Sequence, residues 1–267
     1  MYKMPQKAKL GQNFLVDHSA RIRIVEALGD ISEKIVVEIG PGKAAITELL
    51  ATKARKLIAV ELDRELASNL REQFAEPKAG ITVEILEQDI LTVDLSSLRS
   101  GDDKLLVVGN LPYYITSDIL LHLFRYHDSI SRAVVMMQRE VADRVAAAPG
   151  TRDYGVLSAT TQLYARVEKL LTLPPGAFSP PPQVHSSVLR LTFAPRFIEL
   201  GVDADGFIAF LRQSFAQKRK TLHNNLRAAG YEPMVLSGAA ATAEISLQAR
   251  AEALPLESMA RLYKALR

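Results

Sequence analysis

The stretch Val36-Val-Glu-Ile-Gly40-Pro-Gly42-Lys-Ala-Ala45 decides the fold of this 267-residue chain. The apolar run Ile35–Ile39 leads into two closely spaced glycines, and a segment of helical periodicity, Ala45–Ala54, follows them. This order predicts a buried strand, a tight turn and a helix, in which glycine lets the backbone approach a ligand at the carboxyl end of the strand. Such a turn also occurs without a ligand, so the stretch alone leaves the function open.

Similar apolar runs recur along the chain, separated by segments of helical periodicity. The runs are Leu57–Val60, Ile81–Leu86, Leu105–Val108 and Ala133–Met137. An alternation of strands and helices predicts a mainly parallel sheet with helices on both faces, because parallel strands need crossover connections. The expected fold class is therefore Rossmann-like α/β.

Two further strands are expected before the pattern changes. Val167–Leu173 and the alternating Ser187–Phe193 predict a closing strand pair. Leu173–Pro182, between them, is too rich in proline to be a helix or a central strand, so we expect a structured loop.

Beyond Pro195 the periodicity is helical only. The expected helices are Asp203–Gln217, Lys218–Ala229, a piece near Leu247–Ala253, and Leu256–Leu266. We therefore predict an α/β domain over residues 1–195, beginning with a basic arm over residues 1–17, and a small all-helical domain over residues 196–267.

Composition narrows the class of protein. With 48% hydrophobic and 24% charged residues, the chain has the composition of a soluble globular enzyme. It has no cysteine, which excludes disulfides and thiolate metal sites, and its five histidines are scattered, so we expect no metal. No apolar run is long enough to cross a membrane and no secretory signal is visible, so we expect a cytoplasmic protein without a membrane partner, and a monomer by default.

Two acidic residues end neighbouring strands of the expected sheet. Glu61 follows the second strand, where a carboxylate can accept hydrogen bonds from both hydroxyls of a ribose. Asp89 closes the third strand, where it could accept a hydrogen bond from an adenine amine. Each also has a simpler explanation, a solvated strand end for Glu61 and a helix or turn cap for Asp89.

The most specific motif is Asn110-Leu-Pro-Tyr113, at the end of the fourth expected strand. The lone pair of an adenine amine is conjugated into the ring, so a site that methylates this amine must hold it and draw the lone pair out. The Asn110 side-chain oxygen and the Leu111 carbonyl could accept the two amine hydrogens, while Pro112 keeps Leu111 extended. Tyr113 offers a flat face on which a base can stack. The alternative is an ordinary turn at Pro112 and Tyr113.

With these motifs the chain resembles the ribosomal RNA adenine dimethyltransferases, whose relatives include the Erm methylases. Gly11-Gln-Asn-Phe-Leu15 is similar to the family's amino-terminal motif, and Phe178-Ser-Pro-Pro-Pro182-Gln-Val-His-Ser186 is similar to its proline-rich loop. The resemblance covers nearly the whole length. Without it, the first motif could be a helix start capped at Asp17 or Ser19, and the second a polyproline spacer.

The resemblance implies a fold, a cofactor and a reaction. The fold is a class I methyltransferase domain with a small helical domain after it. The cofactor is S-adenosylmethionine, released as S-adenosylhomocysteine. The reaction is N6,N6-dimethylation of two adjacent adenosines in small-subunit ribosomal RNA, with a role in small-subunit biogenesis and the small-subunit precursor as partner.

The resemblance also implies site residues. The cofactor pocket would be lined by Asn13, Leu15, Gly40, Gly42, Glu61, Asp89 and Asn110. The target base would be surrounded by Asn110, Leu111, Pro112, Tyr113 and Phe178. Three residues depart from the family's usual pattern, namely Lys43 in place of an apolar residue, Ala44 in place of glycine, and Tyr114 in place of asparagine.

Basic residues in two places are candidates for binding RNA phosphates. Near the start these are Lys7 and Lys9, and in the helical part they are Arg212, Lys218, Arg219, Lys220 and Arg227. No acidic residue lies between Arg212 and Arg227, which favours a polyanionic partner over a solvated helix face. The net charge of +3 permits such a partner.

Four other functions would share part of this pattern. An Erm-like methylase of large-subunit RNA would share the core motifs, and a DNA adenine methylase is a more distant possibility. A ribosome-assembly factor whose methylation is secondary is opposed by the intact Asn110, Pro112, Tyr113 and Glu61. A nicotinamide oxidoreductase would share the glycine turn but gives no reason for Asn110-Leu-Pro-Tyr113.

Overall fold

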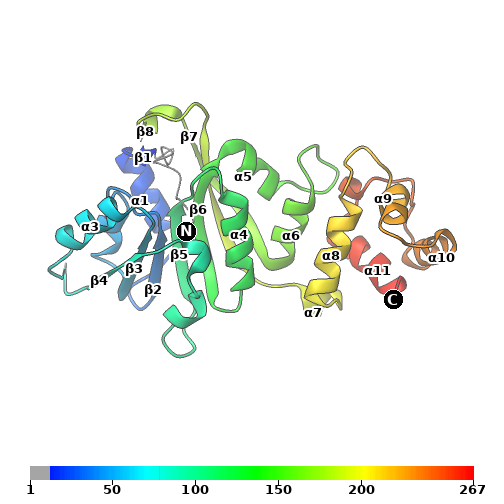
Figure 1. The fold of residues 1–267 in the computed structure, drawn as a ribbon, viewed down its shortest axis with the longest axis horizontal. Coiled ribbons are helices and arrows are strands. Elements are labelled where there is room, and N and C mark those ends of the chain that lie inside the picture. Colours follow the sequence, from blue (N-terminus) through cyan, green and yellow to red (C-terminus); the bar gives the residue numbers. More distant parts are fainter. Residues whose placement is uncertain (1–12, 78) are drawn as a thin grey trace, which may run out of the picture. The chain divides into compact units, whose positions relative to one another are not determined.

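A computed structural model describes residues 13–77 and 79–267 (Figure 1). The chain divides into two compact units. One contains the chain up to Ala142 together with Glu168–Phe193, and the other contains Asp143–Val167 together with Ala194–Arg267. Each unit is described by itself.

A seven-stranded sheet in the order β4-β3-β2-β5-β6-β9-β7 forms the α/β unit. Its strands are β2 (Ile35–Ile39), β3 (Lys56–Glu61), β4 (Val83–Glu87), β5 (Leu105–Asn110), β6 (Ile130–Gln138), β7 (Ala165–Leu173) and β9 (Ser186–Phe193). The first five are parallel, and β9 runs antiparallel to β6. This confirms the mainly parallel Rossmann-like sheet and its closing strand pair.

The strand order places the site. Because β2 pairs with β3 on one side and β5 on the other, the carboxyl ends of these three strands lie side by side. Ligands of open parallel sheets bind at such ends, where the strand order reverses. Gly40, Glu61 and Asn110, which end or follow these strands, are therefore brought together although they are distant in sequence.

The helices of the α/β unit begin at side-chain caps in two places. They are α1 (His18–Glu26), α2 (Thr47–Leu50), α3 (Arg64–Gln73), α4 (Thr116–Arg125) and the start of α5 (Arg139–Ala146), with short 3₁₀ turns η1 (Ile90–Thr92), η2 (Leu95–Leu98) and η3 (Pro175–Ala177). Asp17 caps α1 and Asp63 caps α3, each accepting hydrogen bonds from backbone N–H groups of the first turn. α2 is shorter than the helix expected over Ala45–Ala54, because the segment around it forms separate turns.

The amino-terminal motif and the proline-rich loop pair with each other. The short strand β1 (Phe14–Leu15) lies antiparallel to β8 (Phe178–Ser179), with Leu15 opposite Phe178. The backbone N–H of Val16 also donates to the carbonyl of Ala177 at 2.8 Å. Two motifs separated by more than 160 residues therefore form one small sheet, visible beside α1 in Figure 1.

The helical unit has its own apolar core. Its elements are the end of α5, α6 (Val156–Tyr164), α7 (Phe197–Leu200), α8 (Ala204–Ser214), α9 (Leu222–Ala228), α10 (Pro233–Ala243), η4 (Ala251–Ala253) and α11 (Leu256–Ala265). Buried Phe207 and Phe210 of α8 pack against Tyr263 of α11, and Tyr154 and Leu163 belong to the same cluster.

This cluster explains why the compact units differ from the domains expected at Pro195. The second part of the helical unit begins at Ala194, close to that residue, but the unit also takes in residues 143–167. Tyr154 and Leu163 are almost fully buried in its core, and the Gly150 N–H donates to the Glu252 carbonyl at 2.7 Å. Residues 143–167 thus belong with the carboxyl-terminal helices, because their apolar side chains are buried in the same core.

Two helix predictions in this part were wrong in detail, and one helix was missed. The expected helix Lys218–Ala229 begins only at Leu222, where the Thr221 side chain caps it. The expected piece at Leu247–Ala253 is reduced to the 3₁₀ turn η4. In addition, α10 was not expected at all.

Candidate functional site

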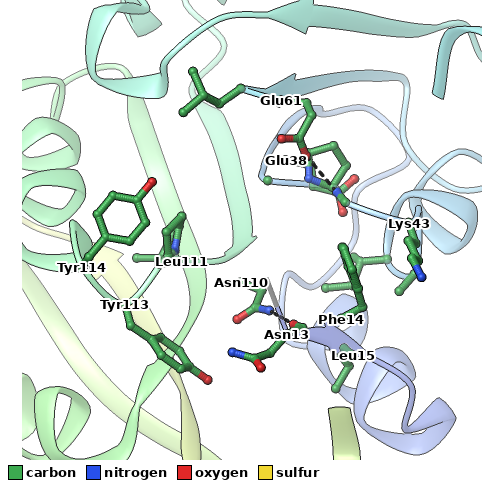
Figure 2. Close-up of a pocket in the computed structure, with 17 residues that line it drawn as sticks. Asn13, Phe14, Leu15, Glu38, Lys43, Glu61, Asn110, Leu111, Tyr113 and Tyr114 are labelled. Atoms are coloured by element: carbon green, nitrogen blue, oxygen red, sulfur yellow. Dashed lines mark hydrogen bonds between the residues drawn. The ribbon is translucent and has the colours of Figure 1, made fainter. Parts of the chain in front are cut away.

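One cavity of the α/β unit opens at the carboxyl ends of β2, β3 and β5 (Figure 2). It brings together most of the residues predicted for the cofactor and the target base. Its lining residues are Asn13, Phe14, Leu15, Glu38, Gly40, Pro41, Gly42, Lys43, Ala45, Ile46, Glu61, Leu62, Asn110, Leu111, Pro112, Tyr113 and Tyr114.

The glycine turn forms one wall of the cavity. Gly40 and Gly42 have φ angles of 64° and 57°, in the left-handed region that glycine enters at little cost. A Cβ atom on Gly42 would also lie 2.9 Å from the Phe14 ring. The turn therefore needs glycine at Gly42 both for its backbone angle and for the close approach of β1.

Two of the departures from the family pattern lie in this turn. Ala44 is fully buried with φ at 63°, a conformation that costs a residue with a Cβ roughly 1–2 kcal/mol. Glycine at this position would avoid that strain. Lys43 is exposed and lines the cavity, with its Nζ 4.7 Å from the centre of the Phe14 ring, so its charge lies at the rim and not in the interior.

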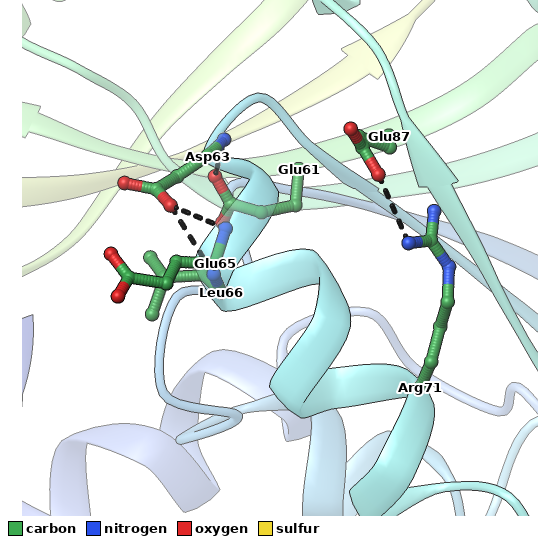
Figure 3. Close-up of polar contacts among 6 residues, drawn as sticks. All are labelled: Glu61, Asp63, Glu65, Leu66, Arg71 and Glu87. Atoms are coloured by element: carbon green, nitrogen blue, oxygen red, sulfur yellow. Dashed lines mark hydrogen bonds and ion pairs between the residues drawn. The ribbon is translucent and has the colours of Figure 1, made fainter.

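Glu61 is 5% exposed and is fixed by backbone N–H groups. Its Oε2 accepts a hydrogen bond from Gly42 at 3.1 Å and its Oε1 accepts one from Asp63 at 2.9 Å. Asp63 in turn caps α3, and an ion pair between Arg71 and Glu87 ties α3 to β4 (Figure 3). Burial raises the pKa of Glu61, and the N–H groups of Asp63 and Gly42 oppose this shift.

Asn110 presents an acceptor to the cavity. Its Nδ2 donates to the Asn13 carbonyl at 2.9 Å, which fixes the side-chain amide between β5 and the segment before β1. Its Oδ1 is buried and has no hydrogen-bond partner among the described residues. An unpartnered buried oxygen costs roughly 1–3 kcal/mol, so this position favours a ligand that donates a hydrogen bond.

The rest of the Asn110-Leu-Pro-Tyr113 motif is held from three directions. The Leu111 N–H donates to the Met136 carbonyl at 2.9 Å, and the Pro112 carbonyl accepts from the Thr116 hydroxyl at 3.0 Å. The Tyr113 hydroxyl lies 2.8 Å from the Ser186 hydroxyl on β9. Burial raises the pKa of Tyr113, so the phenol stays protonated at neutral pH.

Glu38 is a site residue that the sequence argument missed. It lies on β2, is 2% exposed and lines the cavity, and its Oε2 has no hydrogen-bond partner among the described residues. Burial raises its pKa to about 8, against the opposing effect of Thr47. Its signal was a lone carboxylate within the apolar run Ile35–Ile39.

Two predicted site residues do not line this cavity. Asp89 caps η1, where its Oδ1 accepts a hydrogen bond from the Leu91 N–H at 2.9 Å, which fits the simpler of its two explanations. Phe178 is 3% exposed and belongs to the hydrophobic core that also contains Leu15. Phe178 therefore packs in the core next to β1 and does not face the cavity. Leu15, its partner in the strand pair, is both a core residue and a lining residue.

The five basic residues predicted in the helical unit are all exposed. Arg212 and Arg227 lie in the last turns of α8 and α9, and no salt bridge to any of the five is found in the part of the chain that the structure describes. The other three, Lys218, Arg219 and Lys220, lie in the connection between the two helices. Lys7 and Lys9 lie outside the described residues.

A buried asparagine holds this connection in shape. Asn225 of α9 is 3% exposed; its Oδ1 accepts from the Gln217 N–H at 3.2 Å, and its Nδ2 donates to the carbonyls of Ser214 and Gln217 at 2.7 and 3.2 Å. Lys218 is tied down as well, since its Nζ donates to the Arg152 carbonyl at 2.7 Å. We call residues 216–220 the basic loop.

Residues 13–77 and 79–267 show no cluster of metal-ligating side chains and no helix suited to cross a membrane. No group of three or more His, Cys, Asp or Glu side chains there could hold a metal ion. No helix in that part of the chain is both long and apolar enough to cross a bilayer.

Fold and cavity together define a class of protein. A mainly parallel sheet with a glycine turn after its first strand, and a carboxylate at the end of the next, forms a class I methyltransferase domain. Two solved structures share the fold. A dimethyladenosine transferase from Plasmodium falciparum has a TM-score of 0.75 at 22% identity, over 93% of this chain and 95% of that one. The 23S rRNA methyltransferase ErmE has a TM-score of 0.71 at 25% identity, over 95% and 99%.

The chain belongs to the ribosomal RNA adenine dimethylase family, which matches residues 4–267. Ribosomal RNA small subunit methyltransferase A of Acidobacterium capsulatum is 64% identical over 260 residues, which are 97% of this chain and 91% of that protein. The protein of the same name from Koribacter versatilis is 56% identical over 277 residues, or 99% and 96%. The chain is therefore an S-adenosylmethionine-dependent ribosomal RNA methyltransferase.

Proposed function

We propose that this chain transfers two methyl groups to N6 of each of two adjacent adenosines in small-subunit ribosomal RNA, and that it acts during small-subunit biogenesis. The observation that carries the proposal is the Asn110 Oδ1 atom, which is buried at the cavity and has no partner within residues 13–77 and 79–267. The neighbouring Leu111 supplies a second acceptor, its carbonyl. An adenine amine has two hydrogens to give to such a pair.

The cavity suits S-adenosylmethionine. Its buried polar atoms include two acceptors, the carboxylate of Glu61 and the amide oxygen of Asn110, whereas the cofactor carries donors and positive charge. We assign its binding to Asn13, Leu15, Gly40, Gly42, Glu61 and Asn110, with Glu38 added. Asp89 stays in this proposal only as a residue at the margin, because it does not line the cavity.

When bound, the cofactor supplies a methyl group on a sulfonium that is already a good leaving group. The protein's residues then hold and orient the amine. Asn110 and Leu111 accept its hydrogens, so that the nitrogen lone pair is freed from the ring, and Tyr113 stacks on the base. This positioning requires neither a metal nor a strong general base.

The same acceptors limit the reaction to two methyl groups per base. A monomethylated amine keeps one hydrogen that Asn110 or Leu111 can accept, whereas a dimethylated amine has none. The second product therefore loses its hydrogen bonds to the site, which favours its release.

Exposed cations in the helical unit support RNA as the partner. Arg212, Arg219, Lys220 and Arg227 point to solvent without acidic partners among the described residues, as phosphate contacts require. Lys218 donates to a backbone carbonyl, so we assign it a structural role beside its charge. Lys7 and Lys9 remain candidates by sequence alone. We further propose a cytoplasmic monomer that binds no membrane.

The main alternative is an Erm-like methylase of large-subunit RNA, whose fold is similar to this one. The higher identity, 64% against 25%, to a protein named as a small-subunit methyltransferase favours the small subunit. An assembly factor without methylation is disfavoured by the unpartnered Asn110 acceptor, which has no role in such a protein.

Methyl transfer to isolated ribosomal subunits tests the proposal. Unmethylated small subunits, small subunits already methylated and large subunits would each be incubated with labelled S-adenosylmethionine, and the labelled nucleoside would be identified after digestion. We expect N6,N6-dimethyladenosine, about four methyl groups per unmethylated small subunit, and no label in the other two. Label in large subunits would support the Erm-like alternative, and binding without transfer would support the assembly factor.

A further inference from the structure

Tyr114 is the most exposed aromatic side chain at the cavity. It lines the cavity, yet 61% of its surface is exposed. Within the described chain its ring and hydroxyl have no hydrogen bond or ring contact. An exposed aromatic ring leaves a large apolar surface on which another flat group can stack.

Its neighbour Tyr113 also lines the cavity but is fixed in place. Tyr113 is partly buried and its hydroxyl is bonded to Ser186, so its ring is fixed as a wall of the cavity. Figure 2 shows the two rings leaving the backbone in different directions, with Leu111 beside them. The turn is rigid, because the Pro112 carbonyl accepts hydrogen bonds from the Thr116 side chain and the Ile115 N–H.

We propose that Tyr114 forms a second base subsite, which stacks the nucleobase adjacent to the one held at Asn110 and Tyr113. This rests on the proposed function and deepens it, because it gives the site a dinucleotide and not a single base as its recognition unit. Two consecutive tyrosines on a rigid turn offer two ring faces next to each other. Two consecutive unstacked bases of an RNA loop could each stack on one of them. Stacking tolerates any base, so the subsite selects an unpaired neighbour and not its identity.

The subsite explains a requirement of the proposed reaction. A base must leave its stack before it enters the cavity, and its neighbour loses a stacking partner at the same time. Tyr114 would replace that partner at the mouth of the cavity. The neighbouring adenosine is then held close to the cavity while the first is methylated.

A double-mutant cycle on RNA binding tests this directly. The RNA is a hairpin whose loop holds two adjacent adenosines. Two variant hairpins carry an abasic site in place of the first or of the second adenosine. Dissociation constants would be measured by fluorescence anisotropy, with S-adenosylhomocysteine present, for the wild type, Tyr114→Ala and Tyr114→Trp. On the intact loop we expect Tyr114→Ala to weaken binding about tenfold and Tyr114→Trp to bind as the wild type does.

The abasic loops decide the outcome. If Tyr114 stacks the neighbour, one of the two abasic loops binds the wild type and Tyr114→Ala equally, within about twofold. The subsite would be overturned if Tyr114→Ala lost as much affinity for both abasic loops as for the intact loop. It would also be overturned if Tyr114→Ala bound the intact loop as well as the wild type does. Leu121→Ala, which removes an exposed apolar side chain outside the cavity, is the matched control and should leave binding to all three loops unchanged.

The test is separate from that of the proposed function. Methyl transfer to small subunits by the wild type establishes the reaction whatever Tyr114 does. A wild type that transfers methyl groups but shows no coupling between Tyr114 and either neighbouring base refutes only the subsite.

Discussion

The cavity of the α/β unit and the basic loop of the helical unit are built on opposite principles. In the cavity, polar groups are buried, and one oxygen of Glu38 and one of Asn110 have no hydrogen-bond partner among the described residues. In the basic loop, the charged groups are exposed, and the buried Asn225 of α9 that holds the loop has its hydrogen bonds satisfied. In the proposed function this difference separates chemistry from affinity: buried acceptors would hold the reacting amine, whereas exposed cations would attract phosphates at longer range.

The largest effect should come from the unpaired acceptor. We expect Asn110→Ala to lower kcat by roughly 10²–10³, because it removes an oxygen that holds the amine in the reacting state. Methyl transfer to small subunits under saturating RNA and cofactor measures this. Asn224→Ala, which removes an exposed amide from α9, is the control and should keep kcat. A kcat for Asn110→Ala within tenfold of the wild type would show that Asn110 does not hold the amine during methyl transfer.

The second effect is a pH dependence of stability that comes from Glu38. Its folded-state pKa is raised to about 8, so between its unfolded value and pH 8 the folded chain keeps a proton that the unfolded chain has lost. The free energy of unfolding therefore falls as pH rises through this window, by at most about 1.4 kcal/mol per pH unit from this group, and levels off above it.

Glu38→Gln isolates that contribution. The variant cannot lose a proton, so its stability relative to the wild type should increase from pH 5 to pH 8. Urea unfolding of both proteins at several pH values measures the difference. Parallel curves for the two proteins would mean that Glu38 is not a buried, protonated acid.

The third effect concerns the basic loop of the helical unit and the asparagine that holds it. Asn225→Ala removes the side-chain amide that bonds the N–H and carbonyl of Gln217 in the basic loop and the carbonyl of Ser214 at the end of α8. We expect a loss of roughly 1–3 kcal/mol in stability and a higher KM for RNA with little change in kcat. Hydrogen exchange should rise at residues 214–221 before it rises elsewhere. A fall in kcat with an unchanged KM would contradict a role in shaping the loop.

The smallest effect should come from single charges of the loop. Arg219→Gln and Lys220→Gln should each weaken RNA binding modestly and lower the slope of log affinity against log salt by about 0.7–0.9. Binding titrations at several salt concentrations measure the slope, and Lys53→Gln, which removes an exposed charge of the α/β unit, is the control. Equal slopes for the wild type and the loop variants would show that the basic loop does not contact RNA phosphates.

The central strands could be predicted from the sequence because they are buried on both faces. Ile35–Ile39 matches β2 to the residue, since it is rich in Ile and Val and ends clearly at Gly40. By contrast, α10 has the sequence PMVLSGAAATA, which is apolar or small on every side and carries no charge, so it lacks the periodicity that indicates a helix. The extent of the helical unit also depended on tertiary burial of Tyr154 and Leu163, which no local pattern contains.

For the site, motifs at strand ends were predictable and contacts across the chain were not. Glu61, Asn110 and Tyr113 line the cavity as expected, because strand ends of a parallel sheet meet at one edge. The pairing of β1 with β8 buries Phe178 in the core, although the proline-rich loop alone gave no indication of which of its residues face inward. Glu38 was missed because a single carboxylate in a strand carries no spacing signal.

The central claim is that Asn110 Oδ1 accepts a hydrogen bond from the target amine, and RNA discrimination tests it most directly. The affinity of a loop with two unmodified adenosines would be compared with that of a loop carrying N6,N6-dimethyladenosine, for the wild type and Asn110→Ala. The wild type should prefer the unmodified loop by roughly tenfold, and Asn110→Ala should lose most of that preference. An equal preference in both proteins would contradict the account, since the amine would then be recognised without Asn110.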